Sequence, residues 1–110
     1  ARGSGIEIRL DWSKVPLLTG VRELAGHGFV TGASGRNWAG YGEHVALPSG
    51  FAAQDQALLS DPQTSGGLLV ACAPNALDEV LAVFARHGFA QAAVIGEVAA
   101  GSGAARLVVS

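Results

Sequence analysis

Residues 61–72 read Asp-Pro-Gln-Thr-Ser-Gly-Gly-Leu-Leu-Val-Ala-Cys, a polar turn with two adjacent glycines that runs directly into an apolar segment. Pro62 fixes its own φ and biases Asp61 toward an extended conformation, while the glycines permit φ > 0 and leave no side chain between the backbone and a ligand. The pattern predicts a turn over residues 61–67 and a buried strand over residues 68–73. Within the turn, Asp61 is expected to accept hydrogen bonds from the N–H groups that follow it.

The residue types in the turn leave two interpretations open. Its backbone is able to hold an anion such as a phosphate, or it is a plain tight turn that only connects two elements. The sequence departs from a phosphate-binding P-loop, because no lysine follows the glycines and a strand rather than a helix is expected next. Ser65 lies outside any G-x-S-x-G pattern and has no histidine beside it, so it is not predicted to be a nucleophile.

The start of the chain predicts one strand and one short helix. Apolar and charged residues alternate in the run Ile-Glu-Ile-Arg-Leu-Asp-Trp, which predicts a half-buried strand over residues 5–11. A short helix follows, capped by Thr19 and ended by Gly28. Residues 1–5 are small and polar and are expected to be a linker or a frayed start.

Residues 31–50 contain clusters of glycine, serine and asparagine and are predicted to form loops. Arg36 and Asn37 are suited to donate hydrogen bonds to a nucleotide or a carboxylate, or alternatively to satisfy the backbone of the loop. The neighbouring Trp38 and Tyr41 are suited to stack on a base or to anchor the loop by burial. A loop of this length without regular structure is typical of a functional or interface segment.

Two further helices are predicted on either side of the turn. Residues 51–60 are expected to form a short helix or a turn, and Asn75 caps a longer helix that Gly88 ends. The longer helix carries an apolar stripe that is expected to pack on a sheet. The stripe consists of Leu77, Val80, Leu81 and Phe84.

Strands are predicted over residues 93–98 and 104–109, joined as a hairpin by a tight connection at residues 101–103. The order of the elements predicts an α+β (mixed α/β) fold of two layers, in which helices pack on a mixed β-sheet. We expect a single domain over residues 6–110.

Composition excludes several classes of protein. The 110 residues carry a net charge of −2 and a single lysine, so no basic face is available to hold a nucleic-acid backbone. The apolar runs are far shorter than the ~20 residues that span a bilayer, and we expect no membrane segment. With 49% apolar and 15% charged residues, the composition is that of a globular domain.

Chemically reactive residues are few and scattered. Cys72 is the only cysteine and is expected to be a small buried hydrophobe in the predicted strand. A single cysteine rules out an internal disulfide and fits a cytoplasmic protein. His27, His44 and His87 do not have the spacing of metal ligands. The sequence therefore predicts no catalytic residue and no metal site in this chain.

Five segments resemble one enzyme family in their order and spacing. They are Leu-Leu-Thr-Gly-Val-Arg-Glu-Leu at residues 17–24, Gly-Phe-Val at 28–30, Gly-Arg-Asn at 35–37, Asp-Pro-Gln-Thr-Ser-Gly-Gly-Leu-Leu at 61–69 and Ala-Val-Ile-Gly-Glu-Val at 93–98. Together they resemble the C-terminal domain of the selenide, water dikinase (selenophosphate synthetase) family, whose superfamily includes aminoimidazole ribonucleotide synthetase. The resemblance implies the C-terminal fold of that superfamily.

The resemblance also implies an ATP-dependent activity for a longer protein. Enzymes of the family convert selenide, ATP and water into selenophosphate, AMP and orthophosphate, and they depend on Mg²⁺. Their reactive cysteine or selenocysteine, their lysine, their glycine-rich segment and most of their metal-binding aspartates lie in an N-terminal part. Neither Cys72 nor Asp61 matches any of these residues. We therefore expect this chain to be inactive alone and to bind neither ATP nor Mg²⁺ tightly, because the N-terminal domain is missing. The family largely forms homodimers through that N-terminal domain.

Within such an enzyme, the resemblance implies a supporting role for the turn, which is expected to face the cleft between the two domains and to help shape the nucleotide or selenide pocket. The residues expected there are Gln63, Thr64, Ser65, Gly66, Gly67 and Asn37. Two other functions stay open. One is the same domain of a paralogous ATP-using enzyme, of the thiamine-phosphate kinase, hydrogenase maturation factor or purine-biosynthetic synthetase type. The other is a non-catalytic interaction module that holds a partner through residues 31–50.

Overall fold

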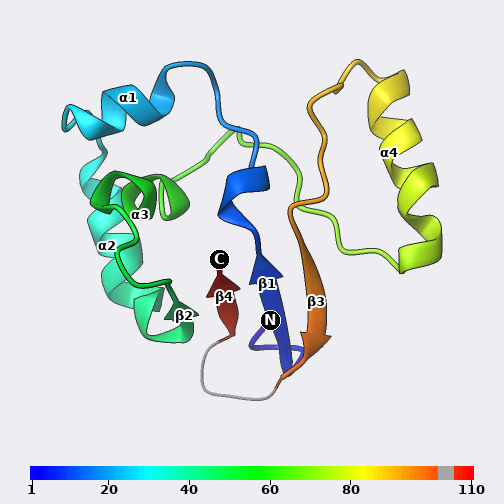
Figure 1. The fold of residues 1–110 in the computed structure, drawn as a ribbon, viewed down its shortest axis with the longest axis horizontal. Coiled ribbons are helices and arrows are strands. Elements are labelled where there is room, and N and C mark those ends of the chain that lie inside the picture. Colours follow the sequence, from blue (N-terminus) through cyan, green and yellow to red (C-terminus); the bar gives the residue numbers. More distant parts are fainter. Residues whose placement is uncertain (102–105) are drawn as a thin grey trace.

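The centre of the fold is a mixed four-stranded sheet. A computed structural model describes residues 1–101 and 106–110 of the chain. The strands are β1 (Ile6–Leu10), β2 (Val45–Ala46), β3 (Gly96–Ala100) and β4 (Leu107–Val109), in the order β2-β4-β1-β3 (Figure 1). β1 runs antiparallel to β3 and parallel to β4, and β2 runs parallel to β4. The predicted α+β class with a mixed sheet is therefore confirmed.

β1 confirms the strand predicted from alternating residues, and it lies between two partners. Ile8 is in register with Val98 on one side and Leu107 on the other. The charged residues are not all exposed, because Glu7 is only 6% exposed and its Oε1 accepts a hydrogen bond of 2.9 Å from Arg9 Nε. This contact with Glu7, followed by one with Glu97, raises the pKa of Arg9.

The C-terminal part of the sheet differs from the predicted hairpin. β3 overlaps the predicted strand of residues 93–98 but begins only at Gly96. β3 and β4 do not pair with each other, since β1 lies between them. Of the predicted final strand, residues 107–109 form β4, whereas residues 104–105 and most of the predicted connection at 101–103 lie outside the described part. The hairpin prediction is wrong because β1 offers β4 a parallel edge.

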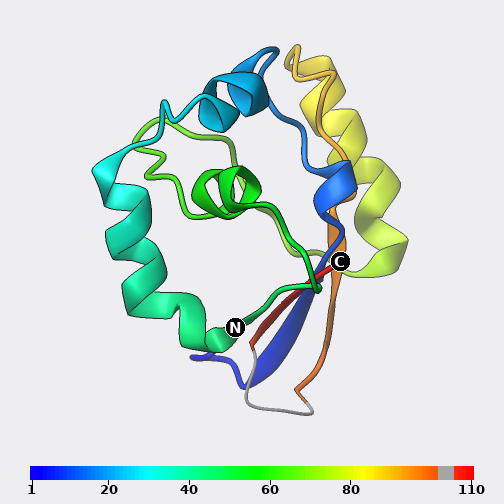
Figure 2. The same ribbon diagram turned by 60° about the vertical axis from the view of Figure 1, so that its left-hand side comes forward.

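Three helices gather on one side of the sheet, and the fourth stands on the other. They are α1 (Val21–Gly26), α2 (Gly32–Tyr41), α3 (Ala53–Leu59) and α4 (Leu77–Arg86). α1 and α2 both contact α3, and both views show these three helices together, with α4 beyond β3 (Figures 1 and 2). Single 3₁₀ turns occur at Trp12–Lys14, Gly42–His44 and Pro74–Ala76. No helix in the described ranges is long and apolar enough to cross a membrane.

The helices α1 and α4 end in the same way, at a His-Gly-Phe tripeptide. Gly28 and Gly88 adopt φ of 89° and 84°, as predicted for residues that end a helix. The N–H of Phe29 donates to the carbonyl of Leu24 at 3.0 Å, and that of Phe89 donates to the carbonyl of Phe84 at 2.9 Å. These bonds close a Schellman motif at each helix.

The N-terminal caps predicted for α1 and α4 are wrong. Gly20 rather than Thr19 precedes α1, and it makes no side-chain cap. Asn75 lies inside the 3₁₀ turn before α4, so the cap position falls to Ala76. Pro74 favours this turn because it fixes φ and lacks an N–H group, which moves the start of the helix beyond Asn75.

Residues 31–50 are not a loop, because half of them form α2. The side chain of Thr31 caps this helix and accepts a hydrogen bond of 3.3 Å from the N–H of Ser34. At the other end, Trp38 packs so closely beneath Gly42 that a Cβ there would lie 2.8 Å from its ring. The glycines that suggested turns are therefore tolerated inside and beside a helix that its cap and this contact stabilise.

The strand predicted over residues 68–73 is absent. These residues have no regular structure, Leu68 and Leu69 are 82% and 76% exposed, and Cys72 is exposed rather than buried. A strand requires a hydrogen-bonded neighbour, and residues 68–73 have none in the described sheet, whose order is β2-β4-β1-β3.

The apolar stripe of α4 is only half-buried and does not pack on the sheet as predicted. The main contacts of α4 are with the preceding 3₁₀ turn, and Figure 1 shows the helix apart from the strands. Phe89 folds back on the stripe instead, since its ring lies edge-on to that of Phe84 with 6.3 Å between centroids. Of the short helix or turn predicted over residues 51–60, the structure shows the helix, α3.

Candidate functional site

The turn of residues 61–67 begins at a carboxylate that is bound to the first turn of α2. Asp61 Oδ1 accepts hydrogen bonds of 3.4 Å from Thr31 Oγ1 and of 3.4 Å from Ser34 Oγ. Its Oδ2 accepts a hydrogen bond from Gln63 Nε2. The expected Asx turn is therefore wrong in its donors, which are side chains rather than the N–H groups that follow Asp61. The hydroxyls of Thr31 and Ser34, which lie at the N-terminal cap of α2, bind the Asp61 carboxylate in place of those N–H groups.

Asn37 lies one helical turn further along α2 and binds Ser60, the residue before Asp61. Its Nδ2 donates a hydrogen bond of 2.9 Å to the carbonyl of Ser60. Of the two roles considered for Asn37, the structure shows the one in which the amide satisfies backbone. The side chain is half-buried, and it lies at the base of the turn rather than at its tip.

The tip of the turn is exposed and closely folded. Residues 62–67 are all exposed, and the N–H of Gly66 donates to the carbonyl of Gln63 at 3.4 Å. A Cβ added to Gly66 would lie 2.7 Å from the Cβ of Gln63, whereas one added to Gly67 would meet nothing within 4 Å. Neither glycine has a positive φ. Gly66 is therefore needed for close approach and not for a left-handed conformation.

A cavity of about 360 Å³ lies beside the base of the turn. Its walls include Asn37, Trp38, Tyr41, Leu59, Asp61 and Leu107. Trp38 is half-buried against Gly42 and anchors the end of α2, while Tyr41 is 64% exposed. The cavity thus has two aromatic walls next to an amide and a carboxylate.

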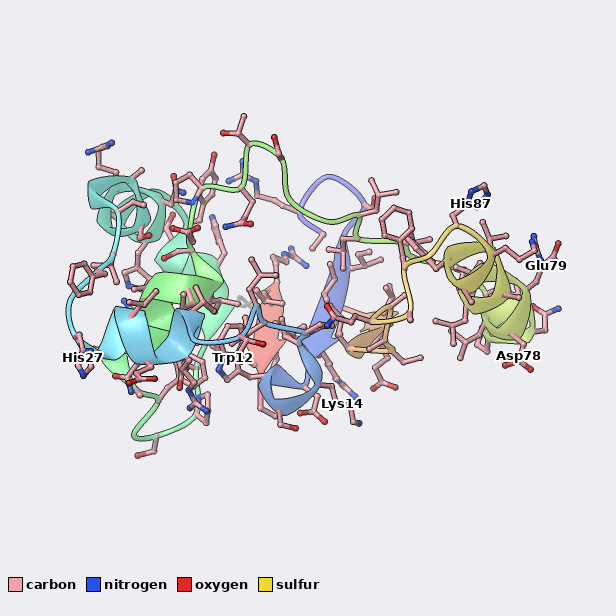
Figure 3. The ribbon with its side chains drawn as sticks, turned by 90° about the horizontal axis from the view of Figure 1, so that it is seen from above. Trp12, Lys14, His27, Asp78, Glu79 and His87 are labelled. Carbon is pink, nitrogen blue, oxygen red and sulfur yellow. The ribbon has the colours of Figure 1, made fainter. Side chains whose placement is uncertain are left out.

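His27 and His87 lie far from each other. Figure 3 shows His27 and His87 on opposite sides of the molecule, at the ends of α1 and α4. His44 Nε2 lies 3.4 Å from Glu43 Oε1 and 3.4 Å from Arg2 Nη1. Within residues 1–101 and 106–110, no three histidine, cysteine or acidic side chains are grouped so that they could hold a metal ion.

Sequence reasoning found the turn and Asn37 but missed the hydroxyls that hold it. Thr31 and Ser34 are three residues apart, which is the spacing of a cap and the N–H that it accepts. That spacing was visible in the sequence. The partner of these hydroxyls was not, because Asp61 lies far along the chain and only the packing of α2 beside α3 brings it near.

Almost the whole chain matches one family. A family model described as "AIR synthase related protein, C-terminal domain" matches residues 1–108. The chain belongs to this family. The resemblance found in the sequence is confirmed, and the mixed sheet with its helices is the fold of an AIR synthase related C-terminal domain.

Three curated relatives of the chain are each named "Selenide, water dikinase". The protein of Pseudomonas straminea is 57% identical over 102 residues, which cover 93% of this chain and 29% of the relative. The protein of Burkholderia pseudomallei is 57% identical over 110 residues, covering 100% and 30%. That of Rhizobium meliloti is 44% identical over 108 residues, covering 98% and 31%. The chain therefore spans about a third of the length of the curated relatives that it matches.

Proposed function

We propose that this chain is the C-terminal domain of a selenide, water dikinase. Joined to an N-terminal part, it contributes one wall of the site at which selenide, ATP and water give selenophosphate, AMP and orthophosphate. The observation that carries this proposal is the 57% identity across the entire chain to a protein of that name. The names of the relatives do not favour the paralogous enzymes or the free-standing interaction module.

In this proposal the charged machinery belongs to the N-terminal part. The family keeps its reactive cysteine, lysine and most metal-binding aspartates there, and Mg²⁺ and ATP would be held mainly by those residues. Phosphoryl transfer depends on positioning and on charge stabilisation more than on a protein nucleophile. A second domain contributes by closing the site and excluding water.

The turn is the proposed contact between this domain and the reacting groups. The proposed cleft-facing residues of its tip, Gln63, Thr64, Ser65, Gly66 and Gly67, are exposed, and its backbone is not covered by large side chains. Asn37 supports the turn from behind, because its amide holds Ser60. Backbone N–H groups of a glycine turn suit an anion such as the phosphates of ATP.

The same proposal includes the cellular location and the oligomeric state of the complete enzyme. We place it in the cytoplasm, where a single unpaired cysteine is stable, and we expect a homodimer formed largely through the N-terminal parts. The net charge of −2 supports a small-molecule substrate rather than a nucleic acid.

The test is a chimera in which this chain replaces the matching C-terminal residues of the Burkholderia pseudomallei relative. We expect AMP formation that requires both selenide and Mg²⁺. Within the chimera, Gly66→Ala is expected to lower kcat/KM about tenfold or more, because the new Cβ displaces Gln63 at the turn. Gly67→Ala is the matched control, since its Cβ has free space, and it should change kcat/KM by less than about twofold.

Two results would contradict the proposal. One is a folded chimera that forms no selenophosphate. The other is selenophosphate formation by this chain alone, which would mean that the reaction does not need an N-terminal part.

A further inference from the structure

A row of small polar side chains runs along α2 on the side that faces the base of the turn. Thr31, Ser34 and Asn37 are spaced three residues apart, which keeps them on neighbouring positions of a helix surface. We call these three residues the polar seam. Thr31 and Ser34 donate to Asp61, and Asn37 donates to the Ser60 carbonyl. The polar seam therefore binds two consecutive residues immediately before the turn.

Few other contacts hold the tip of the turn in the part of the chain that the structure describes. There, its hydrogen bonds join Gly66 to Gln63 and Gln63 to Asp61, so they stay within residues 61–67. All residues from 62 to 67 are exposed. The position of the tip relative to the rest of the domain is thus set mainly by its attachment at Ser60 and Asp61.

Ser34 is the most constrained member of the polar seam. It is 3% exposed, and its Oγ lies 3.2 Å from Thr31 Oγ1 and 3.4 Å from Asp61 Oδ1. The carboxylate of Asp61 also lies at the N-terminal end of α2, where the helix dipole favours negative charge. A buried hydroxyl in this place has no access to a substrate, so it acts only through Asp61.

We propose that Ser34 and Asp61 are positioning residues, which hold the glycine turn where its backbone meets the phosphate groups of ATP. The kinetic part of this inference rests on the proposed function, whereas the structural part does not. If the contact between them is lost, the turn moves freely and must be ordered each time that ATP binds. The consequence is weaker ATP binding with little change in the chemical step.

The structural part is tested by NMR relaxation on this chain. In the wild type we expect backbone order parameters of about 0.85 for residues 63–67. In Ser34→Ala and in Asp61→Ala we expect these order parameters to fall to about 0.6 or lower. The double variant should fall no further than Asp61→Ala alone, because Asp61→Ala already removes the contact that Ser34→Ala removes. Asp61→Asn keeps an accepting oxygen and should retain most of the order. Ser49→Ala, an exposed serine on another segment, is the control.

The kinetic part uses the chimera described above. Ser34→Ala is expected to raise KM for ATP about tenfold, the effect of one hydrogen bond to a charged group, with kcat within about twofold of the wild type. Asp61→Asn should restore KM most of the way relative to Asp61→Ala. A purely structural loss would lower the amount of folded protein and leave both constants unchanged.

The outcomes separate the two proposals. Unchanged order parameters in Ser34→Ala would overturn the positioning role, whatever the chimera does. A mobile turn with unchanged KM and kcat would also overturn it, because the turn would then not meet ATP. An inactive wild-type chimera would overturn the proposed function, and the order parameters would still decide whether Ser34 and Asp61 hold the turn.

Discussion

Gly96→Ala is expected to weaken the pairing of β1 with β3 severely. A Cβ at this position would lie 2.0 Å from the carbonyl oxygen of Arg9 and 3.2 Å from the Cα of Leu10. Both atoms belong to backbone, so no side-chain rotation relieves the contact, and β3 must retreat from β1. The retreat would also break the hydrogen bond of 2.8 Å from the N–H of Asp11 to the carbonyl of Ile95.

The magnitude follows from these two effects. Overpacking against backbone costs about 1–3 kcal/mol, and the loss of one hydrogen bond adds ~1 kcal/mol. For a domain of this size, each kcal/mol corresponds to about 4–8 °C in Tm, so we expect a decrease of at least about 8 °C. Thermal and urea unfolding followed by circular dichroism measure both quantities.

The matched control is Gly35→Ala, a second glycine replaced by the same residue. Gly35 is exposed inside α2, and its added Cβ would meet nothing within 4 Å. Alanine is the better helix former, so this variant should be more stable by about 0.5–1 kcal/mol. If Gly96→Ala lowered Tm by less than about 4 °C, or if the two variants shifted Tm in the same direction, the reasoning about β3 would be refuted.

Two further variants test charged side chains. Arg22→Met removes the cation whose Nη2 lies 2.6 Å from Asp55 Oδ2. The side chain of Asp55 is 4% exposed, whereas that of Arg22 is 62% exposed. We therefore expect the free energy of unfolding in urea to fall by about 1–3 kcal/mol, which is less than for a fully buried pair. Asp55→Asn in the same chain should recover most of the loss, and no recovery would contradict an unpaired buried charge as its cause. The pKa of Asp11 is lowered, first by the hydrogen bond from Ser13 and then by Lys14. The ionised Asp11 carboxylate therefore stabilises the fold above its unfolded-state pKa, and this stabilisation disappears as pH falls through the folded-state pKa. Asp11→Ala should accordingly be less stable than the wild type at neutral pH and equal to it in strong acid, and a stability difference that does not change with pH would show that the carboxylate charge has no part in it.

The parts of the fold that sequence predicted are those whose signals are local. The alternation in residues 6–12 marked β1, and Gly28 and Gly88 marked the ends of two helices. α2 was missed because glycines lower helix propensity, while its stabilising contacts, the Thr31 cap and the packing of Trp38, depend on how side chains meet.

Residues 68–73 show a different reason why a prediction from sequence can fail. An apolar run indicates that a segment prefers burial, but it does not supply the strand that would pair with it. The candidate site shows the same division. The motif of the turn led to the prediction that Gln63 to Gly67 face the cleft, and Asn37 was predicted from the family pattern. The contact between Ser34 and Asp61 joins residues that are 27 positions apart, and no local pattern reports it.

The arrangement of the sheet has a consequence for synthesis of the protein. β1 receives both of its neighbours from residues 96–110, and the N–H of Trp12 donates to the carbonyl of Ser110 at 2.8 Å. On the ribosome, β1 is therefore made before either of its neighbours, and both of its edges stay unpaired until residues 96–110 have been synthesised. Contacts so distant along a chain slow folding and leave unpaired edges exposed to other chains. Nascent protein of this kind would depend on a chaperone during that interval more than a domain whose neighbouring strands are consecutive.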